Sequence, residues 1–201
     1  MKRVAISACG SNRGKTIFAT ALLYHFRGDV RPFKVGPDFI DPQFHKRVAL
    51  KESVNLDSFM MSKEQVEWIY NHYATYKWAV IEGVMGFYDG DDRGCSTYSI
   101  TKDLDIPVVM LLDGSSSYIT IIALLKGLLE YRKDNTIKAV VINKVSSKSH
   151  YELIKNLISK EFSHIEVLGW IKKGLQSLKE THLGLVLKDL SKIESISKEV
   201  L

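Results

Sequence analysis

The segment from Val4 to Thr16, VAISACGSNRGKT, constrains the fold more than any other part of this chain. A short apolar run leads into a glycine-containing loop, and the loop ends in the triplet GKT, where a helix is expected to begin. This order is typical of a phosphate-binding loop, whose backbone N–H groups and lysine surround phosphate while the threonine hydroxyl holds Mg²⁺. The loop is a variant, because Cys9 stands where the common motif has glycine. The predicted phosphate-binding residues are Gly10, Ser11, Asn12, Arg13, Gly14, Lys15 and Thr16.

The composition is that of an ordinary water-soluble protein. The 201 residues fit one domain, and 45% of them are hydrophobic and 25% charged. No apolar run approaches the roughly 20 residues of a membrane span, and the first residues lack a signal-peptide profile. We therefore expect a cytoplasmic protein with no membrane partner.

Charge and cysteine content exclude further classes. The net charge of +5 comes largely from lysines scattered through the last third of the chain, without a basic stripe interleaved with aromatic residues. Such a pattern is typical of a solvated surface and does not favour nucleic acid as a partner. Cys9 and Cys95 are too few for a disulfide framework or a zinc site, so both are expected to be reduced thiols.

Strands and helices alternate along the chain. Short apolar strands separated by crossover helices predict an α/β fold, a mostly parallel β-sheet with helices on both faces. Residues 1–201 are expected to form this single domain, and its ligands should lie at the carboxyl ends of the strands. The expected strands are 4–7, 30–36, 78–83, 106–113, 137–145 and 165–171, and the expected helices are 15–26, 62–76, 99–104, 118–132 and 150–162.

Acidic residues follow the second and third expected strands. The turn after the second strand presents Asp38 and Asp41, with Lys34 just before them. Glu82 ends the third strand, where phosphate-loop enzymes have an acidic residue linked to Mg²⁺, and Asp89 lies on the loop that follows. The alternative role of these acids is the capping and solvation of turns.

Several of these segments together resemble the ATP-binding domain of the cobyrinic acid a,c-diamide synthase family. They are KVGPDFIDPQFH, NLDSFM, VIEGVMGFYDG and THLGL, and the loop SACGSNRGKT is similar to the one that this family shares with dethiobiotin synthetase. The resemblance covers Val4 to about Leu185. It implies a P-loop NTPase-like, dethiobiotin synthetase-like fold, with ATP and Mg²⁺ as cofactors. The implied substrate is a corrinoid or other tetrapyrrole polycarboxylate, whose acetate carboxylates are activated and then amidated.

The resemblance also implies roles for individual residues. A carboxylate reacts with ammonia only after phosphorylation, because oxide is a poor leaving group. The site must therefore bring together two anions, the substrate carboxylate and ATP. Lys34 is expected to bind phosphate or the substrate carboxylate, and Asn143 either reads the adenine edge or caps backbone groups. The implied catalytic residues are Lys15, Asp38, Asp41, Glu82 and Asp89, and the implied Mg²⁺ ligands are Thr16, Asp41 and Glu82.

The resemblance raises the question of the nitrogen source. In this family ammonia comes from a C-terminal glutaminase domain, which we expect to be absent here, leaving a separate glutaminase subunit or free ammonium. Residues 186–200 have helical apolar spacing, and this helix either closes the core or docks a glutaminase. A homodimer is also expected. Among the histidines, His45 and His182 are the candidates for the site.

Two other functions remain open. One is a dethiobiotin synthetase-like ligase acting on a smaller substrate, although VMGFYDG after Glu82 differs from the glycine-rich segment of those enzymes. The other is a nucleotide-switch ATPase that acts by conformational change. That class has a second lysine at the start of the phosphate loop, where this chain has Ser7 to Cys9.

Overall fold

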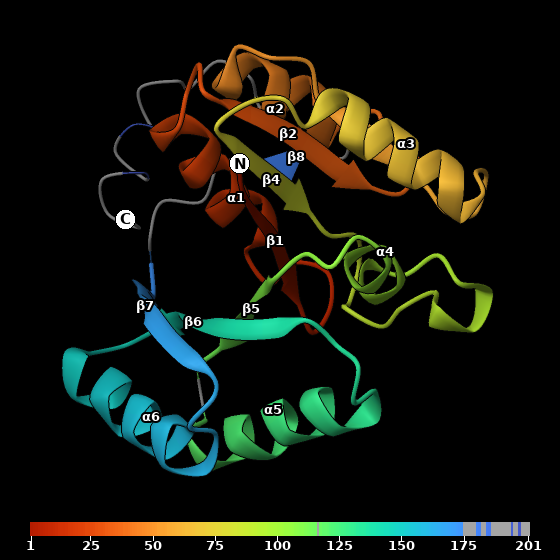
Figure 1. The fold of residues 1–201 in the computed structure, drawn as a ribbon. Helices are drawn as coiled ribbons and strands as arrows, with labels where there is room; N and C mark the ends of the chain where they lie inside the picture. The colour runs from red at the N-terminus through yellow and green to blue at the C-terminus, as the bar shows by residue number, and fades with distance from the viewer. Residues whose placement is uncertain (116, 175–179, 182–183, 186–193, 195–196, 198–201) are drawn as a thin grey trace.

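The protein is a single parallel sheet flanked by helices (Figure 1). The computed structural model describes residues 1–115, 117–174, 180–181, 184–185, 194 and 197. The seven strands run in the order β3-β2-β4-β1-β5-β6-β7, and every neighbouring pair is parallel. They are β1 (Lys2–Ala8), β2 (Val30–Val35), β3 (Val54–Leu56), β4 (Trp78–Glu82), β5 (Val108–Asp113), β6 (Ile137–Val145) and β7 (Glu166–Lys172).

Helices cover both faces of this sheet. They are α1 (Lys15–His25), α2 (Asp41–Ala49), α3 (Lys63–Tyr73), α4 (Thr97–Asp103), α5 (Ile119–Tyr131) and α6 (Lys148–Glu161), with a 3₁₀ turn η1 (Asp91–Arg93). A short antiparallel pair, β8 (Glu180–Thr181) and β9 (Gly184–Leu185), lies outside the main sheet.

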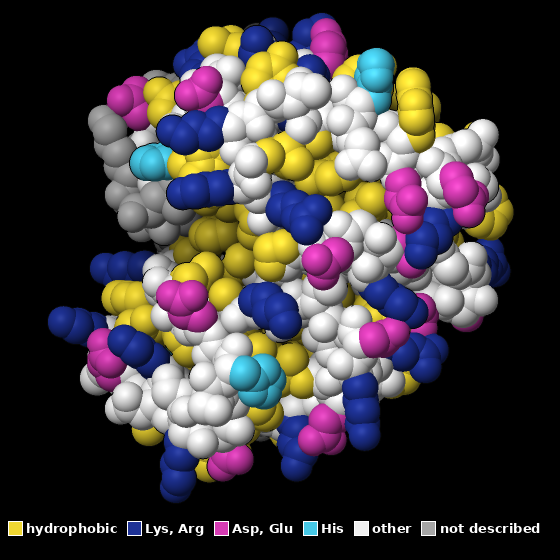
Figure 2. Space-filling model, in the orientation of Figure 1, with side chains coloured by type: hydrophobic (Ala, Val, Ile, Leu, Met, Phe, Trp, Pro, Cys, Tyr) yellow, Lys and Arg dark blue, Asp and Glu magenta, His cyan; other side chains and the backbone are white. Residues whose placement is uncertain are grey.

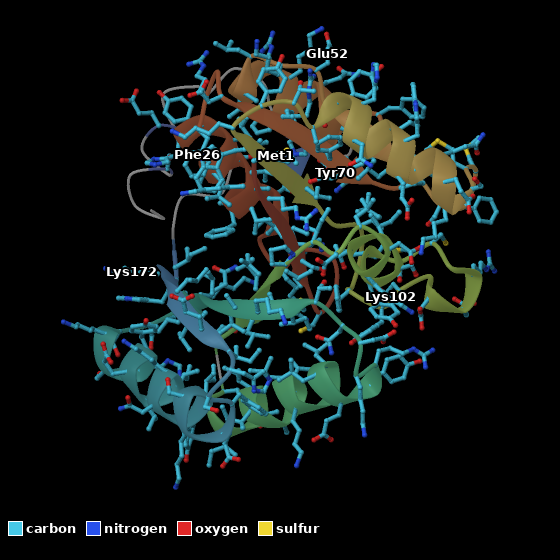
Figure 3. All side chains as sticks on the ribbon, in the orientation of Figure 1. Met1, Phe26, Glu52, Tyr70, Lys102 and Lys172 are labelled. Atoms are coloured by element: carbon cyan, nitrogen blue, oxygen red, sulfur yellow. The ribbon has the colours of Figure 1, made fainter. Side chains whose placement is uncertain are left out.

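The core has two layers, one on each face of the sheet. Helices α1 and α2 contribute to the first layer, for example through Phe18 and Phe44. Helices α3 to α6 contribute to the second; Tyr70 of α3, labelled in Figure 3, belongs to it. The ring of Tyr70 packs on Phe33 of β2. Because both faces are covered, β5 (VVMLLD) and most of β4 (WAVIE) read as continuous apolar runs without alternation. The predicted α/β class with a parallel sheet is confirmed.

Most expected elements lie where the sequence placed them. The helix after residue 62 begins with a capping pair: Gln65 N donates to Ser62 Oγ at 3.3 Å, and Ser62 N donates to Gln65 Oε1 at 2.8 Å. Among the strands of the main sheet and the α-helices, two elements were missed, namely α2 and the three-residue strand β3; the turn η1 and the pair β8 and β9 were not expected either. Both α2 and β3 are short, and the turn residues around Pro37 hid the start of α2.

Charged side chains are interspersed on the surface, with lysines and arginines scattered among acidic residues on the face drawn in Figure 2. Within the described residues, no helix combines the length and apolarity needed to cross a bilayer. His182 and most of the expected helix over 186–200 lie outside the described residues.

Candidate nucleotide site

The phosphate loop lies at the centre of the sheet, because β1 pairs with β4 on one side and with β5 on the other. Gly14 caps α1 with a φ of 94°, a left-handed conformation that favours glycine. A Cβ on Gly14 would lie 2.4 Å from Nδ2 of Asn143, so the close approach of β6 also requires glycine here. The predicted strand, loop and helix order is therefore present.

Lys15 is buried at the start of α1 and bridges two loops. Its Nζ donates to the carbonyl of Gly10 at 2.8 Å and to the carbonyl of Met85, in the loop after β4, at 2.7 Å. Burial lowers the pKa of Lys15, although the nearby charge of Glu82 opposes this effect. The ammonium thus lies between the two loops that would enclose a bound phosphate.

Glu82 connects three elements through its two carboxylate oxygens. Thr16 Oγ1 donates to Oε1 at 2.5 Å, and Oε2 lies 2.6 Å from Nε2 of His45 on α2. Burial alone would raise the pKa of this fully buried carboxyl. The charge of Lys34 and the hydrogen bonds from His45 and Thr16 outweigh burial and lower the pKa to about 2. Glu82 is therefore held ionised beside the phosphate loop.

Lys34 lies among the predicted catalytic carboxylates. Its Nζ is 2.8 Å from Asp41, 3.4 Å from Glu82 and 3.7 Å from Asp38. Burial opposes its charge, yet Glu82 and Asp41 raise the pKa of Lys34 above its ordinary value. Burial and the charge of Glu82 raise the pKa of Asp41. We call Lys34, Asp38, Asp41, His45 and Glu82 the acidic centre.

The register of the sheet brings this centre together. Lys34 on β2 pairs directly with Glu82 on β4, so both side chains point to the same face. Asp38 shapes the approach to α2, because its Oδ1 accepts hydrogen bonds from Ile40 N at 2.8 Å and Asp41 N at 3.2 Å. His45, a candidate from sequence, contacts Glu82 directly.

Asp89 makes a local contact rather than joining the acidic centre. Its Oδ2 accepts a hydrogen bond from Gly86 N at 2.7 Å, which is the turn capping that the sequence left open. A Cβ on Gly86 would lie 2.8 Å from this oxygen and 3.1 Å from the carbonyl of Cys9. The loop after β4 therefore packs closely on the phosphate loop.

A second charged cluster, which the sequence analysis missed, lies beyond the phosphate loop at the ends of β5 and β6. Asp113 Oδ2 accepts from Arg13 at 2.8 Å and from Lys144 at 3.0 Å, and its Oδ1 accepts from Ser115 N at 3.0 Å. Burial raises the pKa of Asp113, but these donors hold it well below its usual range. The signal in the sequence was the polar segment DGSSS at a strand end.

Asn143 at the end of β6 supports the phosphate loop. Its Nδ2 donates to the carbonyl of Arg13 at 2.9 Å, and its Oδ1 accepts from Lys144 N at 2.8 Å. The amide thus caps backbone groups, one of its two expected roles, and it does so next to the predicted nucleotide.

The acidic centre fits Mg²⁺ by its chemistry. Thr16 bonds to Glu82, and Lys34 contacts both Glu82 and Asp41, so the oxygen atoms of Thr16, Asp41 and Glu82 lie close together. The carboxylates of Asp38, Asp41 and Glu82 outnumber the one ammonium of Lys34. Within the described residues, no three His, Cys, Asp or Glu side chains converge as a metal site made of protein alone. Mg²⁺ is commonly held by one or two carboxylates together with substrate phosphates, and Asp41 and Glu82 would supply the two carboxylates of such a set.

A phosphate-binding loop after the central strand of a parallel sheet, with an acidic residue ending the adjacent strand, defines a P-loop nucleotide-binding domain. The family model described as "AAA domain" matches residues 2–181. The chain belongs to this family.

Curated relatives agree with the resemblance seen in the motifs. The chain is 39% identical over 191 residues to the cobyrinate a,c-diamide synthase of Saccharolobus solfataricus, covering 92% of the chain and 43% of that protein. It is 38% identical over 206 residues to the enzyme of the same name from Methanocaldococcus jannaschii, covering 97% of the chain and 46% of that protein. The chain therefore spans less than half the length of these relatives.

Solved structures agree with the fold. Chloroplast FtsY from Physcomitrella patens matches with a TM-score of 0.59 and 14% identity, over 98% of this chain and 65% of that one. The McdA–ATP complex from Cyanothece matches with a TM-score of 0.57 and 13% identity, over 100% of this chain and 96% of that one.

Proposed function

We propose that residues 1–201 form one ATP-binding synthetase domain of the cobyrinate a,c-diamide synthase type. Its activity is ATP-dependent amidation, in which acetate carboxylates of a tetrapyrrole are activated as acyl phosphates and then converted to amides. The single observation that carries this proposal is the continuity of the phosphate loop with the acidic centre, through the bond of Thr16 to Glu82. The names of the relatives supply the reaction class.

The first step is phosphoryl transfer. Lys15 exchanges the carbonyls of Gly10 and Met85 for phosphate oxygens of ATP, because an anion attracts the ammonium more strongly than neutral carbonyls do. A substrate carboxylate oxygen attacks the γ-phosphorus, the bond to the β-phosphate oxygen breaks, and ADP leaves. Ammonia then attacks the acyl carbon, inorganic phosphate leaves and a proton is released.

The acidic centre balances the negative charges that meet in this step. Lys34 neutralises negative charge where the substrate carboxylate meets the γ-phosphate, and Asp38 and Asp41 hold the start of α2 in place. Asp89, outside this centre, holds the loop after β4. Thr16, Asp41 and Glu82 would hold Mg²⁺, which supplies charge neutralisation on the phosphates when bound. Gly10, Ser11, Asn12, Arg13 and Gly14 surround the phosphates, and Asn143 fixes the loop.

The test is ATP hydrolysis in the presence of candidate acceptors. We expect tetrapyrrole polycarboxylates with free acetate groups to stimulate hydrolysis, and hydroxylamine to trap an ATP-dependent hydroxamate of the same acceptor. Lys15→Ala is the control, because it removes the phosphate ligand and should abolish both signals.

Other outcomes identify the alternatives. Stimulation by diaminopelargonate, with no effect of any tetrapyrrole, would assign the chain to the dethiobiotin synthetase-like ligases. Hydrolysis that no acid or amine stimulates would contradict a ligase and point to a nucleotide-switch ATPase.

A further inference from the structure

A basic cavity lies away from the acidic centre, at the ends of α1 and α2 and the beginnings of β2 and β4. Its volume is about 1020 Å³, and Glu52, labelled in Figure 3, lies on its wall. The lining residues are Arg27, Arg31, Gln43, Lys46, Arg47, Leu50, Lys51, Glu52 and Tyr76. Five of these described residues are Lys or Arg and one is acidic, so the lining carries a formal charge of +4, against +5 for the whole chain.

The cations come from separate elements and face one space. Helix α2 contributes Gln43, Lys46 and Arg47, which lie three and four residues apart and therefore on one face of the helix. Arg27 follows α1, and Arg31 lies on β2. Side chains from three elements thus line one wide-open pocket on the surface, and most of them are exposed.

Part of the wall is held rigidly. Arg31 donates to the carbonyl of Glu52 at 2.8 Å and lies 4.8 Å from the ring centre of Tyr76, while Lys51 lies 5.0 Å from the same ring. Tyr76 thus separates two cations and fixes their spacing. The acidic Glu52 forms an ion pair with Lys46, which leaves an excess of positive charge around the cavity.

We propose that this cavity binds a compact polyanion, a small molecule carrying several phosphate or carboxylate groups. Arginine forks match the oxygens of both groups, and a multiply charged ligand offsets the repulsion among the cations. The volume exceeds that of a single phosphate and suits a ligand of nucleotide size.

The cavity is linked to the acidic centre by α2. The same nine-residue helix carries Asp41 and His45 toward Lys34 and Glu82, and Lys46 and Arg47 toward the cavity. A ligand in the cavity would therefore contact the helix that carries Asp41, and its binding chemistry does not depend on the proposed amidation.

The experiment measures tripolyphosphate and citrate binding by calorimetry at physiological salt, on the whole chain carrying Lys15→Ala to weaken the phosphate loop. Adding Arg27→Gln, after α1, and Lys46→Gln, on α2, removes two of the five cations and should weaken binding at least tenfold. The matched control adds Lys126→Gln and Lys160→Gln, two exposed lysines on α5 and α6, and removes the same charge. It should bind as the Lys15→Ala protein does.

Comparison of tripolyphosphate with citrate shows whether the cavity prefers phosphate or carboxylate groups. Binding of either anion supports the proposal if the cavity substitutions weaken that binding and the control substitutions do not. Lys46→Arg, which keeps the charge, should retain binding. The proposal is overturned if neither anion binds, or if the cavity and control substitutions weaken binding equally, because the attraction would then come from net charge alone.

Discussion

Lys34 is one cation among three carboxylates, and the protein gives two of these carboxylates opposite properties. Burial would raise the pKa of Glu82, but the charge of Lys34 outweighs burial and lowers this pKa. The pKa of Asp41 is raised by burial and by the charge of Glu82. Pairs of acids whose environments separate their pKa values commonly divide roles in a site. Here Glu82 stays ionised, and Asp41 is the carboxyl closer to accepting a proton.

The first prediction concerns catalysis by these two acids. Asp41→Asn and Glu82→Gln should each slow the phosphoryl step by about 100-fold, since preorganised charges matter most in the transition state. ATP affinity should change far less. Single-turnover kinetics and equilibrium nucleotide binding measure the two quantities separately. Loss of ATP binding with a normal rate at saturating ATP would contradict the roles proposed for Asp41 and Glu82.

The second prediction is the pH dependence of stability. The folded-state pKa of Glu82 lies below its ordinary value, so its stabilising contribution is present above pH 4.5 and is lost as the pH falls through about 2. The difference in free energy of unfolding between the wild type and Glu82→Gln should therefore shrink by roughly 3 kcal/mol over this interval. Denaturant unfolding at several pH values measures it.

An exposed glutamate provides the control for this pH profile. Glu67 lies on α3, and Glu67→Gln should give a profile parallel to that of the wild type. If the free energy of unfolding of Glu82→Gln also changes with pH in parallel with that of the wild type, Glu82 is not the group whose protonation destabilises the fold in this pH range.

At the scale of elements, the phosphate loop is supported from both sides. The loop after β4 contacts it through Lys15 and Met85, and β6 contacts it through Asn143 and Arg13. Strand order explains why: β1 lies between β4 and β5, and β6 follows β5. The loop is therefore shaped by residues more than 60 positions away in the sequence.

The third prediction tests the support from β6. Asn143→Ala removes two hydrogen bonds to backbone groups and should lower the free energy of unfolding by about 1–3 kcal/mol. It should also lower ATP affinity about tenfold, because the phosphate loop loses its anchor. Thermal unfolding and nucleotide titration measure the two effects.

The matched control is another asparagine that binds backbone carbonyls away from the loop. Asn135 donates to Leu129 and Arg132, so Asn135→Ala should lower stability without changing ATP affinity. Equal losses of ATP affinity in the two variants would show that Asn143 acts through global stability alone.

The sequence predicted the long helices and strands and the residues of the candidate site better than the hydrogen bonds between those residues. The pattern of apolar residues identified α3, whereas α2 has only nine residues and begins at Asp41, within the segment after the second strand that was expected to be a turn. Asp41 and Glu82 were identified from their place after strands. The bonds of Glu82 to His45 and of Asp113 to Arg13 depend on strand order, which local sequence patterns do not encode.

At the scale of the molecule, the nitrogen source is the main open question of the proposed reaction. The 201-residue sequence has two cysteines. Cys9 lies in the phosphate loop, and Cys95 lies 3.5 Å from the carbonyl of Gly90. Neither has the sharp Gly-x-Cys-x-Gly turn that exposes a glutaminase nucleophile. This points to ammonia supplied from outside these 201 residues.

The fourth prediction follows from this placement. The purified chain should form amide with ammonium and ATP but not with glutamine and ATP, and adding a separate glutaminase should restore glutamine dependence. Product analysis by mass spectrometry checks each donor. Glutamine-dependent synthesis by the pure chain would contradict the prediction, and no synthesis with ammonium would favour a relative that does not amidate.

The bonds of Lys15 to the loop after β4 also bear on the order in which the substrates bind. Met85, whose φ of 43° is left-handed, is held by Lys15 through its carbonyl in the loop that follows Glu82. The phosphate oxygens of ATP would compete with the Met85 carbonyl for Lys15 Nζ, and loss of that bond would loosen the loop beside the acidic centre. We therefore expect a compulsory sequence of addition in steady-state kinetics, with ATP as the leading substrate and the acid entering only after the loop has been released.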